Sequence, residues 1–429
     1  MAKKTLILLI ILIVLSGSQQ LRATGFSVFE IGARAAAMAG AYVAHVDDVS
    51  AIYYNPAGLA FLDGVRIKTN VLFSILRTTA SHNTFGNYES KLLQLRGAHF
   101  LAWNLFDRFS IGIGIFNPYI AETSWMEDNP YSYNTKFNIY TIRPALALKL
   151  LKGLSIGFGV DIAFATLSWA HSLEWYEGIY GPYHARSRYE VNGNGMGYVV
   201  GILWKVGKMF HFGGRYQHKV SPNLAGLNFF RGVYDYPVSN VTGSITMPSE
   251  LVLGLKFAPL DNLVLCLDFQ KVRWSQTKGW KYQYDETQEH WGQGFYEIWE
   301  EFLNFSQEES RKSAVLRFKD TWTLKFGLEY SLNDKFALRA GYAHHPSAVS
   351  DGATHLIYPD LDRKIITFGF GYEGPLFSIW KSDTSMSELS LDLFLQYVMT
   401  EAQTSSIPGY EFTFDNDHFV IGLGLGFNF

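Results

Sequence analysis

Apolar and polar residues alternate along the last segment of the chain, "HFVIGLGLGFNF" (418–429). Successive side chains of a β-strand point to opposite faces, so a strand here would have one apolar face. The residues on that face are Phe419, Ile421, Leu423, Leu425, Phe427 and Phe429. A strand of a soluble sandwich could carry such a face, but six large apolar groups in a row are more typical of a membrane barrel strand that faces lipid.

The same alternation recurs elsewhere, in "RFSIGIGIF" (108–116), "TWTLKFGLEY" (321–330) and "ELSLDLFLQY" (388–397). Charged residues such as Lys325 and Asp392 fall on the faces opposite the apolar ones. A membrane barrel would place these charges in its lumen, whereas a sandwich would place them in bulk water. The lengths of the connections between strands distinguish the two architectures.

The pattern predicts fourteen strands, and the connectors between them alternate between short and long. The strands are expected at 65–78, 91–104, 109–120, 135–150, 153–169, 189–206, 209–219, 242–258, 262–275, 314–330, 335–345, 363–372, 388–400 and 417–429. Short turns are expected at 105–108, 150–153, 206–209, 258–262 and 332–335, and long loops at 79–90, 121–134, 170–188, 220–241, 276–313, 346–362 and 401–416. Only connector 373–387 breaks the alternation. Short turns on one rim and long loops on the other predict an all-β fold, a 14-stranded antiparallel transmembrane β-barrel.

The first 23 residues are interpreted as a signal peptide. Lys3 and Lys4 precede the apolar core "TLILLIILIVL" (5–15), which is shorter than the roughly 20 residues that a membrane-spanning helix needs. Cleavage is expected after Ser18 or after Ala23. No later stretch is apolar for 18 residues, so we expect an exported protein without a transmembrane helix, located in the outer membrane of a Gram-negative cell.

Residues 24–64 precede the first predicted strand and have a different composition. The segment is rich in alanine, the best helix former, and glycines at 32 and 40 divide it into short helices. It forms either a soluble cap or a plug, here called the hatch, inside the lumen of the barrel 65–429. A barrel of about fourteen strands would otherwise leave a water channel. Glycines on inward faces leave room for a second backbone and favour the hatch; they lie at 112, 114, 157, 159, 422, 424 and 426.

Several stretches resemble the FadL/TodX family of outer-membrane transporters for long-chain fatty acids and other hydrophobic compounds. They are "GARAAAMAGAYVAHVDDVSAIYYNPAGLA" (32–60), "DFQKVRWSQ" (268–276), "WTLKFGLEYSLNDKFALRAGYAHHPS" (322–347) and the terminal phenylalanine strand. The resemblance covers essentially the whole mature chain. It implies a fourteen-stranded barrel with an N-terminal hatch that carries the signature Asn55, Pro56 and Ala57.

The resemblance also implies a substrate pocket against the hatch. Its expected lining residues are Phe26, Val28, Phe29 and Ile31. A fatty carboxylate would require a cation, and Arg143 and Arg339 are the two candidates if their strand faces point inward. The residues alone do not choose between them.

In this family, substrate is expected to leave sideways through a gap at a kink in the third strand. In this chain Asn117, Pro118 and Tyr119 interrupt that strand. Proline cannot donate a ladder hydrogen bond, so Pro118 independently predicts a local break in strand pairing. The alternative is that the strand simply ends there. The glycine usual in this kink is not evident.

Composition excludes several other functions. The chain has 429 residues, of which 48% are hydrophobic and 16% aromatic, with a net charge of −3 that gives no basis for nucleic-acid binding. Its single cysteine, Cys266, fits neither a disulfide framework nor a tetrahedral metal site. His344 and His345 are adjacent in a strand and point to opposite faces, so no metal site is expected. No catalytic motif is evident, and we expect neither an enzyme nor a cofactor.

The sequence therefore predicts a passive outer-membrane channel for hydrophobic molecules, chiefly long-chain fatty acids. Its expected partners are the hydrophobic ligand, outer-membrane lipid and lipopolysaccharide, and the barrel-assembly machinery, which would engage the strand that ends at Phe429. An aromatic-rich loop, 276–313, would either collect substrate or pack on its neighbours. Two alternatives stay open: a channel for aromatic hydrocarbons, and a barrel that serves secretion or surface attachment.

Overall fold

The computed structural model describes most of the chain. The described residues are 27, 31–84, 86–125, 134–176, 182–231, 239–277, 281–284, 318–349, 352, 354, 356, 358–375, 388–406 and 411–429. Among them, no helix has both the length and the apolar character needed to cross a membrane.

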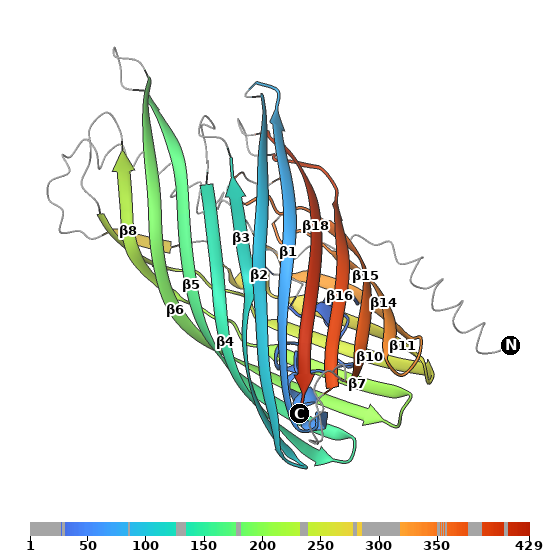
Figure 1. The fold of residues 1–429 in the computed structure, drawn as a ribbon. Helices are drawn as coiled ribbons and strands as arrows, with labels where there is room; N and C mark the ends of the chain where they lie inside the picture. The colour runs from blue at the N-terminus through green and yellow to red at the C-terminus, as the bar shows by residue number, and fades with distance from the viewer. Residues whose placement is uncertain are drawn as a thin grey trace.

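The described strands form one closed antiparallel sheet (Figure 1). Strand β1 (Val65–His82) pairs with β2 (Gly86–Phe106) on one side and with β18 (Thr413–Asn428) on the other, which closes the ring. The strands between are β3 (Phe109–Ser124), β4 (Asn134–Leu151), β5 (Leu154–Tyr176), β6 (Pro182–Val206), β7 (Phe210–Gln217), β8 (Asn223–Arg231), β9 (Ser239–Ser244), β10 (Glu250–Leu260), β11 (Leu263–Val272), β12 (Lys281–Tyr284), β13 (Thr321–Ser331), β14 (Phe336–His345), β15 (Arg363–Pro375), β16 (Glu388–Thr400) and β17 (Gln403–Thr404).

These eighteen strands make a barrel of fourteen, as predicted. Strands β7 and β8 both pair with β6, so together they form one interrupted barrel strand. Strands β9 and β10, and β11 and β12, form two more interrupted barrel strands in the same way. The two-residue β17 lies beside β18 without adding to the ring.

The five predicted short turns are confirmed, and both ends of the barrel meet at the rim that carries them. The Val65 amide donates to the Phe429 carbonyl at 3.1 Å, and the Phe429 amide donates back at 2.8 Å. Three predicted long loops are wrong, because strand pairing continues through most of 79–90, 170–188 and 220–241. Hydropathy stops alternating where the outer face leaves lipid, but the backbone ladder needs no lipid and extends further.

Outward side chains form an apolar band around the barrel. On β1 the band runs from Val65 to Ile75 and ends at Arg77. The ten steps between these two residues, at about 3.3 Å each and tilted by about 40°, span roughly 25 Å of bilayer. On β18 the outward row ends in the same way at Asp417, which is the register partner of Arg77.

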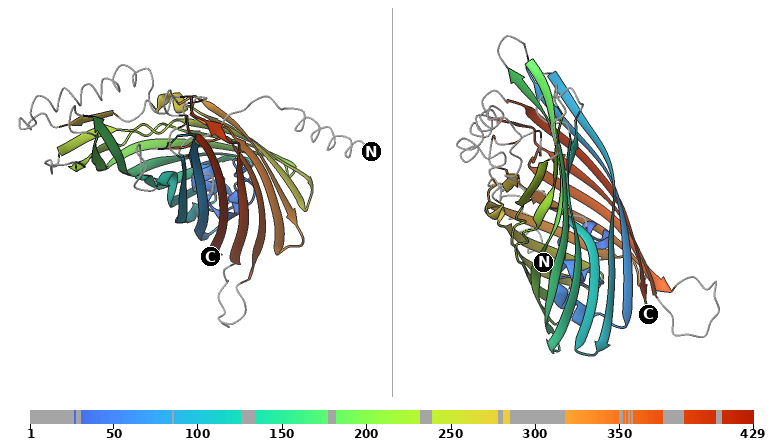
Figure 2. Two further views of the ribbon diagram at one scale, coloured as in Figure 1. Left: turned by 90° about the horizontal axis from the view of Figure 1, so that it is seen from above. Right: turned by 90° about the vertical axis from the view of Figure 1, so that its left-hand side faces the viewer.

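The hatch lies inside this ring (Figure 2). It contains α2 (Ala33–Ala36), α3 (Ala51–Tyr54) and the 3-10 helix η1 (Pro56–Phe61). Helix α2 contacts β16, β18, β15 and β1, whereas η1 contacts β4, β5 and β6 across the lumen. A further 3-10 helix, η3 (Trp274–Gln276), follows β11.

Four of the predicted inward glycines allow the hatch to approach the wall. A Cβ at Gly157 would lie 2.3 Å from the Ala57 nitrogen, so only glycine fits beside the hatch backbone there. Cβ atoms at Gly112 and Gly114 would meet Ile52, and one at Gly424 would meet Ala33. The other three, at 159, 422 and 426, instead make room for side chains of neighbouring barrel strands.

Replacing Leu423 with arginine tests the lipid face. Leu423 is 42% exposed and lies within the apolar band, so Leu423→Arg should cost roughly 2–4 kcal/mol of stability if it sits near the midplane of the bilayer. Urea-induced unfolding in lipid vesicles measures this change.

The matched control is Asp417→Arg, the same new side chain on the same face of β18 but beyond the apolar row. It loses only exposed contacts with Arg77 and the Tyr397 hydroxyl, so it should cost no more than about 1 kcal/mol. Equal stability of the two variants would show that the assigned lipid face is wrong. Gly422 cannot serve as a control, because a Cβ there would lie 2.0 Å from the Phe394 ring.

Candidate functional site

The Asn-Pro-Ala segment fastens the hatch to the wall through the Asn55 side chain. Its amide nitrogen donates to the carbonyls of Val43 and Ile202, both at 2.9 Å, and its oxygen accepts from the Ala57 amide. Pro56 begins η1, where its missing N–H is not needed. Asn55 is fully buried and links two parts of the hatch to strand β6. This role explains why asparagine precedes the proline.

A buried arginine on β4 holds the carbonyl end of α3. Arg143 donates two hydrogen bonds to Asp161, at 2.6 and 3.0 Å, and further bonds to the Ile52 and Tyr53 carbonyls at 3.2 Å. Arg215 adds a bond of 2.8 Å to the same Tyr53 carbonyl. Cations are favourable at the C-terminal end of a helix, where carbonyl groups lack partners.

A second ionic network joins the other side of the hatch to the opposite wall. Arg34 of the hatch lies 2.8 Å from Asp47 and 3.0 Å from Glu329 of β13. Burial alone would raise the pKa of Asp47, but Arg34 and His45 lower it well below its usual range. From Glu329 the network continues along the inner wall through Arg339, Asp392 and Lys68, and it returns to the hatch at Asp48.

One group in this network has side chains of a metal-binding type. Ligand atoms of His45, Asp47 and Glu329 all lie within 4.8 Å of one another. Arg34 already donates to both carboxylates, and a guanidinium cannot be deprotonated in a protein. The arginine therefore occupies the place of a cation, and the geometry does not fit a metal site.

The predicted pocket residues do not line one common cavity among the described residues. Phe26, Val28 and Phe29 lie outside the described residues. Ile31 is buried within the hatch core rather than at a cavity wall. Arg143 and Arg339 both point into the lumen, but each is bound to carboxylates of the barrel wall.

Strand β3 parts from β2 halfway along its length. Their register runs from Phe106–Phe109 to His99–Ile115, and over the remaining described residues of both strands it goes no further. Strand β3 continues beside β4, with a register shift between Phe116 and Tyr119. The shift contains Asn117 and Pro118, so the strand breaks its pairing with β2 but does not end there.

The outer surface shows the consequence of this parting. Leu93 and Leu95 of β2 are 71% and 74% exposed, whereas Ile113, on the paired half of β3, is 40% exposed. The strand that would cover the flank of these leucines has withdrawn toward the lumen, since Phe116 and Tyr119 are buried. The backbone ladder between β2 and β3 is therefore interrupted within the height of the apolar band, and this interruption is called the opening below.

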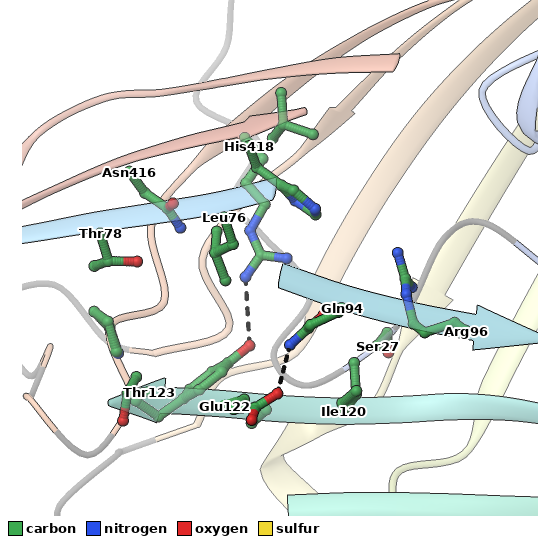
Figure 3. A pocket seen from close by; sticks show the side chains of 15 residues that line it. Ser27, Leu76, Thr78, Gln94, Arg96, Ile120, Glu122, Thr123, Asn416 and His418 are labelled. Carbon is green, nitrogen blue, oxygen red and sulfur yellow. Dashed lines mark hydrogen bonds between the residues drawn. The ribbon is translucent and has the colours of Figure 1, made fainter. Parts of the chain in front are cut away.

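A cavity of about 80 Å³ lies on the lumen side of this opening (Figure 3). Its wall combines apolar and polar groups from β1, β2, β3, β16, β18 and the start of β15 with the segment before it. The lining includes Leu76, Ile120, Tyr358, Val398, Gln94, Arg96, Glu122 and Arg363. Ser27 also lines it and forms an isolated bridge with Tyr119, so this residue borders both the cavity and the edge of β3 that faces away from β4.

Side chains span the parted strands on the lumen side. The Gln94 side-chain amide donates to Glu122 at 3.0 Å (Figure 3). The Ser124 backbone amide donates to the Ser90 hydroxyl at 2.9 Å. These bonds replace part of the missing ladder without closing the outer surface.

Residues 14–429 match the family model described as outer membrane protein transport protein (OMPP1/FadL/TodX). The chain belongs to this family. Membership places it in the outer membrane among transport proteins. A search of curated proteins found no match.

Solved structures of this type share the fold. A FadL homologue of Pseudomonas aeruginosa matches with a TM-score of 0.79 and 17% identity, over 95% of this chain and 100% of that one. The toluene transporter TodX of P. putida matches with a TM-score of 0.69 and 15% identity, over 96% and 99%. The toluene transporter TbuX of Ralstonia pickettii matches with a TM-score of 0.65 and 16% identity, over 94% and 98%.

Sequence reasoning missed the polar residues that line the cavity. Gln94 and Arg96 alternate with outward leucines on β2, so their inward direction was readable from the pattern. Their importance depends on β3 leaving β2 at that height. No feature of β2 by itself reports this.

Removing the Asn55 side chain should loosen the hatch of this FadL/TodX-type barrel. Asn55→Ala leaves the buried Val43 and Ile202 carbonyls without these partners, at a cost of roughly 1–3 kcal/mol. Amide hydrogen exchange across residues 41–62 should accelerate about tenfold or more. Asn87→Ala, at an exposed position, is the control; equal exchange in both variants would contradict the anchoring role.

Deleting residues 24–46 tests whether the hatch blocks the lumen. The deletion removes Arg34, Tyr42 and Val43, with their bonds to Glu329 and Asp268 of the wall, but leaves every barrel strand intact. The barrel should assemble and conduct small polar solutes in a liposome-swelling assay. A variant that assembles but stays impermeable would indicate that the rest of the chain seals the lumen.

Proposed function

We propose that this protein is a passive channel through which hydrophobic molecules, chiefly long-chain fatty acids, enter from outside and leave sideways into the membrane. The observation that supports it most directly is the parting of β3 from β2 inside the apolar band. An apolar chain leaving there passes from protein to lipid without contacting water. Each CH₂ group kept out of water is worth about 0.8 kcal/mol, so such a path needs no energy source.

The cavity suggests how binding is coupled to opening. About 80 Å³ holds several water molecules but not a long hydrocarbon, so the ligand must displace part of the wall. Ser27 of the N-terminal segment is one of the lining residues. A ligand that binds better when this segment has moved shifts the population toward the open form.

The composition of the cavity wall favours a substrate with a carboxylate head. Arg96 and Arg363 bring two guanidinium groups to it, against the one carboxylate of Glu122, beside Leu76, Ile120 and Val398. Arg363 also pairs with Asp360 at 2.8 Å, so Arg96 is the cation that the proposal assigns to the substrate. Guanidinium groups match carboxylates in geometry and charge. An aromatic hydrocarbon is the second candidate, because TodX and TbuX, which share the fold, are described as toluene transporters. A secretion or attachment barrel would not require an opening toward lipid.

A crosslink across the opening tests the exit. In Gln94→Cys/Glu122→Cys, a reducible bis-methanethiosulfonate reagent would join β2 and β3 where the two native side chains now meet. Uptake of labelled palmitate by cells that lack other such transporters should fall to background. Binding of palmitate to the purified, crosslinked protein should persist, and a reducing agent should restore uptake.

The control pair is Ser74→Cys/Gln94→Cys, at register partners of β1 and β2 that are already joined by the ladder. The same reagent should leave its uptake unchanged. Undiminished uptake through the crosslinked Gln94/Glu122 variant would rule out the lateral exit, and a path along the barrel axis would replace it.

A further inference from the structure

The lipid face carries a polar pair where its neighbours are apolar. His99 of β2 and Thr69 of β1 are register partners on the outer surface, and the His99 Nδ1 lies 3.3 Å from the Thr69 hydroxyl. Their register partners on the next strands are apolar: Ile115 of β3 lies beside His99, and Leu425 of β18 lies beside Thr69. Polar side chains that face hydrocarbon are costly, and an ionisable one there is by default a sign of function.

His99 lies at the foot of the opening. His99–Ile115 is the last register pair that joins β2 to β3, and the parted stretch of β2 begins at the next residue, Ala98. On the outer face of β2, Trp103 lies four residues from His99 toward the short-turn rim. His99 is therefore roughly 10 Å deeper in the bilayer than Trp103. A molecule that leaves through the gap would therefore pass this imidazole within the membrane.

The imidazole ring of His99 points along β2 toward the stretch that has parted from β3. The Nε2 atom lies 3.1 Å from the place where a Cβ of Gly97 would stand, so the imidazole covers Gly97, the next outward position toward the parted stretch. Among the described residues, Nε2 has no hydrogen-bond partner. When the Thr69 hydroxyl donates to Nδ1, the neutral ring carries its hydrogen on Nε2, at the edge of the gap.

We propose that His99, oriented by Thr69, binds the carboxyl group of the substrate on the outer surface while its hydrocarbon chain enters the lipid. The proposal rests on the proposed function, since it assumes a carboxylate-bearing substrate that leaves between β2 and β3. His99 is then a specificity-determining residue. It lowers the cost of bringing a polar head into hydrocarbon, and it offers nothing to a ligand without such a head.

The spacing along β2 fits a transfer between two polar groups. Arg96 lines the cavity on the inner face, and His99 lies three residues away on the outer face, or roughly 10 Å along the strand. The edge of β2 between them has no ladder partner from β3 beyond His99. A carboxyl group can therefore move from the guanidinium, past this edge, to the imidazole, over a distance shorter than an extended long-chain fatty acid.

The variant His99→Leu separates this role from folding. Leucine suits a lipid-facing position, so the barrel should assemble at least as well as the parent. In cells that lack other such transporters, uptake of labelled palmitate should fall roughly tenfold, the low end of what a hydrogen bond to a charged group contributes. Uptake of hexadecane, which has no carboxyl group, should be unchanged relative to the parent, as should palmitate binding in the cavity of the purified protein, which His99 does not line.

Two further variants sharpen the test. Gly97→Ala should push the imidazole aside and reduce palmitate uptake as well, but should have no added effect in the His99→Leu background. His99→Gln keeps an N–H donor and should recover part of the loss.

The outcomes distinguish the two proposals. Equal palmitate uptake by the parent and His99→Leu would overturn the role of His99 and leave the proposed function standing. An equal fall in palmitate and hexadecane uptake would show that His99 only shapes the gap. No palmitate uptake by the parent would contradict the proposed function itself.

Discussion

A backbone inside a bilayer must satisfy its hydrogen bonds within the protein, because lipid offers no partners. This constraint determines the ring: β1 pairs with both β2 and β18, and the Val65 and Phe429 backbones bond to each other where the two ends meet. A closed ring of about fourteen strands is wide enough to leave a water channel. The same constraint that closes the wall therefore creates a lumen that the chain must fill.

The hatch fills that lumen with a backbone whose polar groups also need partners. Arg143, Arg215, Asp268 and Ser155 of the wall bond directly to hatch backbone atoms. The ion pairs of Arg34 and Lys68 add charge complementarity between hatch and wall. Buried ion pairs contribute little net stability but are costly when one partner is left alone in a dry site. They therefore hold the hatch in one arrangement, and water entering the lumen would weaken them.

Where β2 and β3 part, the backbone edges lack the ladder hydrogen bonds that a bilayer requires, and nearby groups supply some of the missing bonds. Gln94 and Glu122 bond across the parted strands, Ser124 bonds to Ser90, and Ser27 of the N-terminal segment pairs with Tyr119. These contacts involve side chains and a terminal segment rather than a continuous ladder. They can be exchanged for other contacts at a lower cost than breaking a paired strand.

The sequence by itself determined the barrel, because the period of two in its strands reports directly which face meets lipid. It also indicated the strand number, the short rim, the inward glycines that admit the hatch, and the break at Pro118, since proline removes a ladder donor wherever it occurs. It did not determine how far the strands extend beyond lipid, because there both faces are polar and the hydropathy signal fades. Only the tertiary structure decided that Arg143 and Arg339 are held by Asp161, Glu329 and Asp392. Only it decided that Gln94, Arg96 and His99 surround an opening. Those relations lie between strands rather than within one strand, and the second of them depends on where β3 leaves β2, which no pattern within β2 reports.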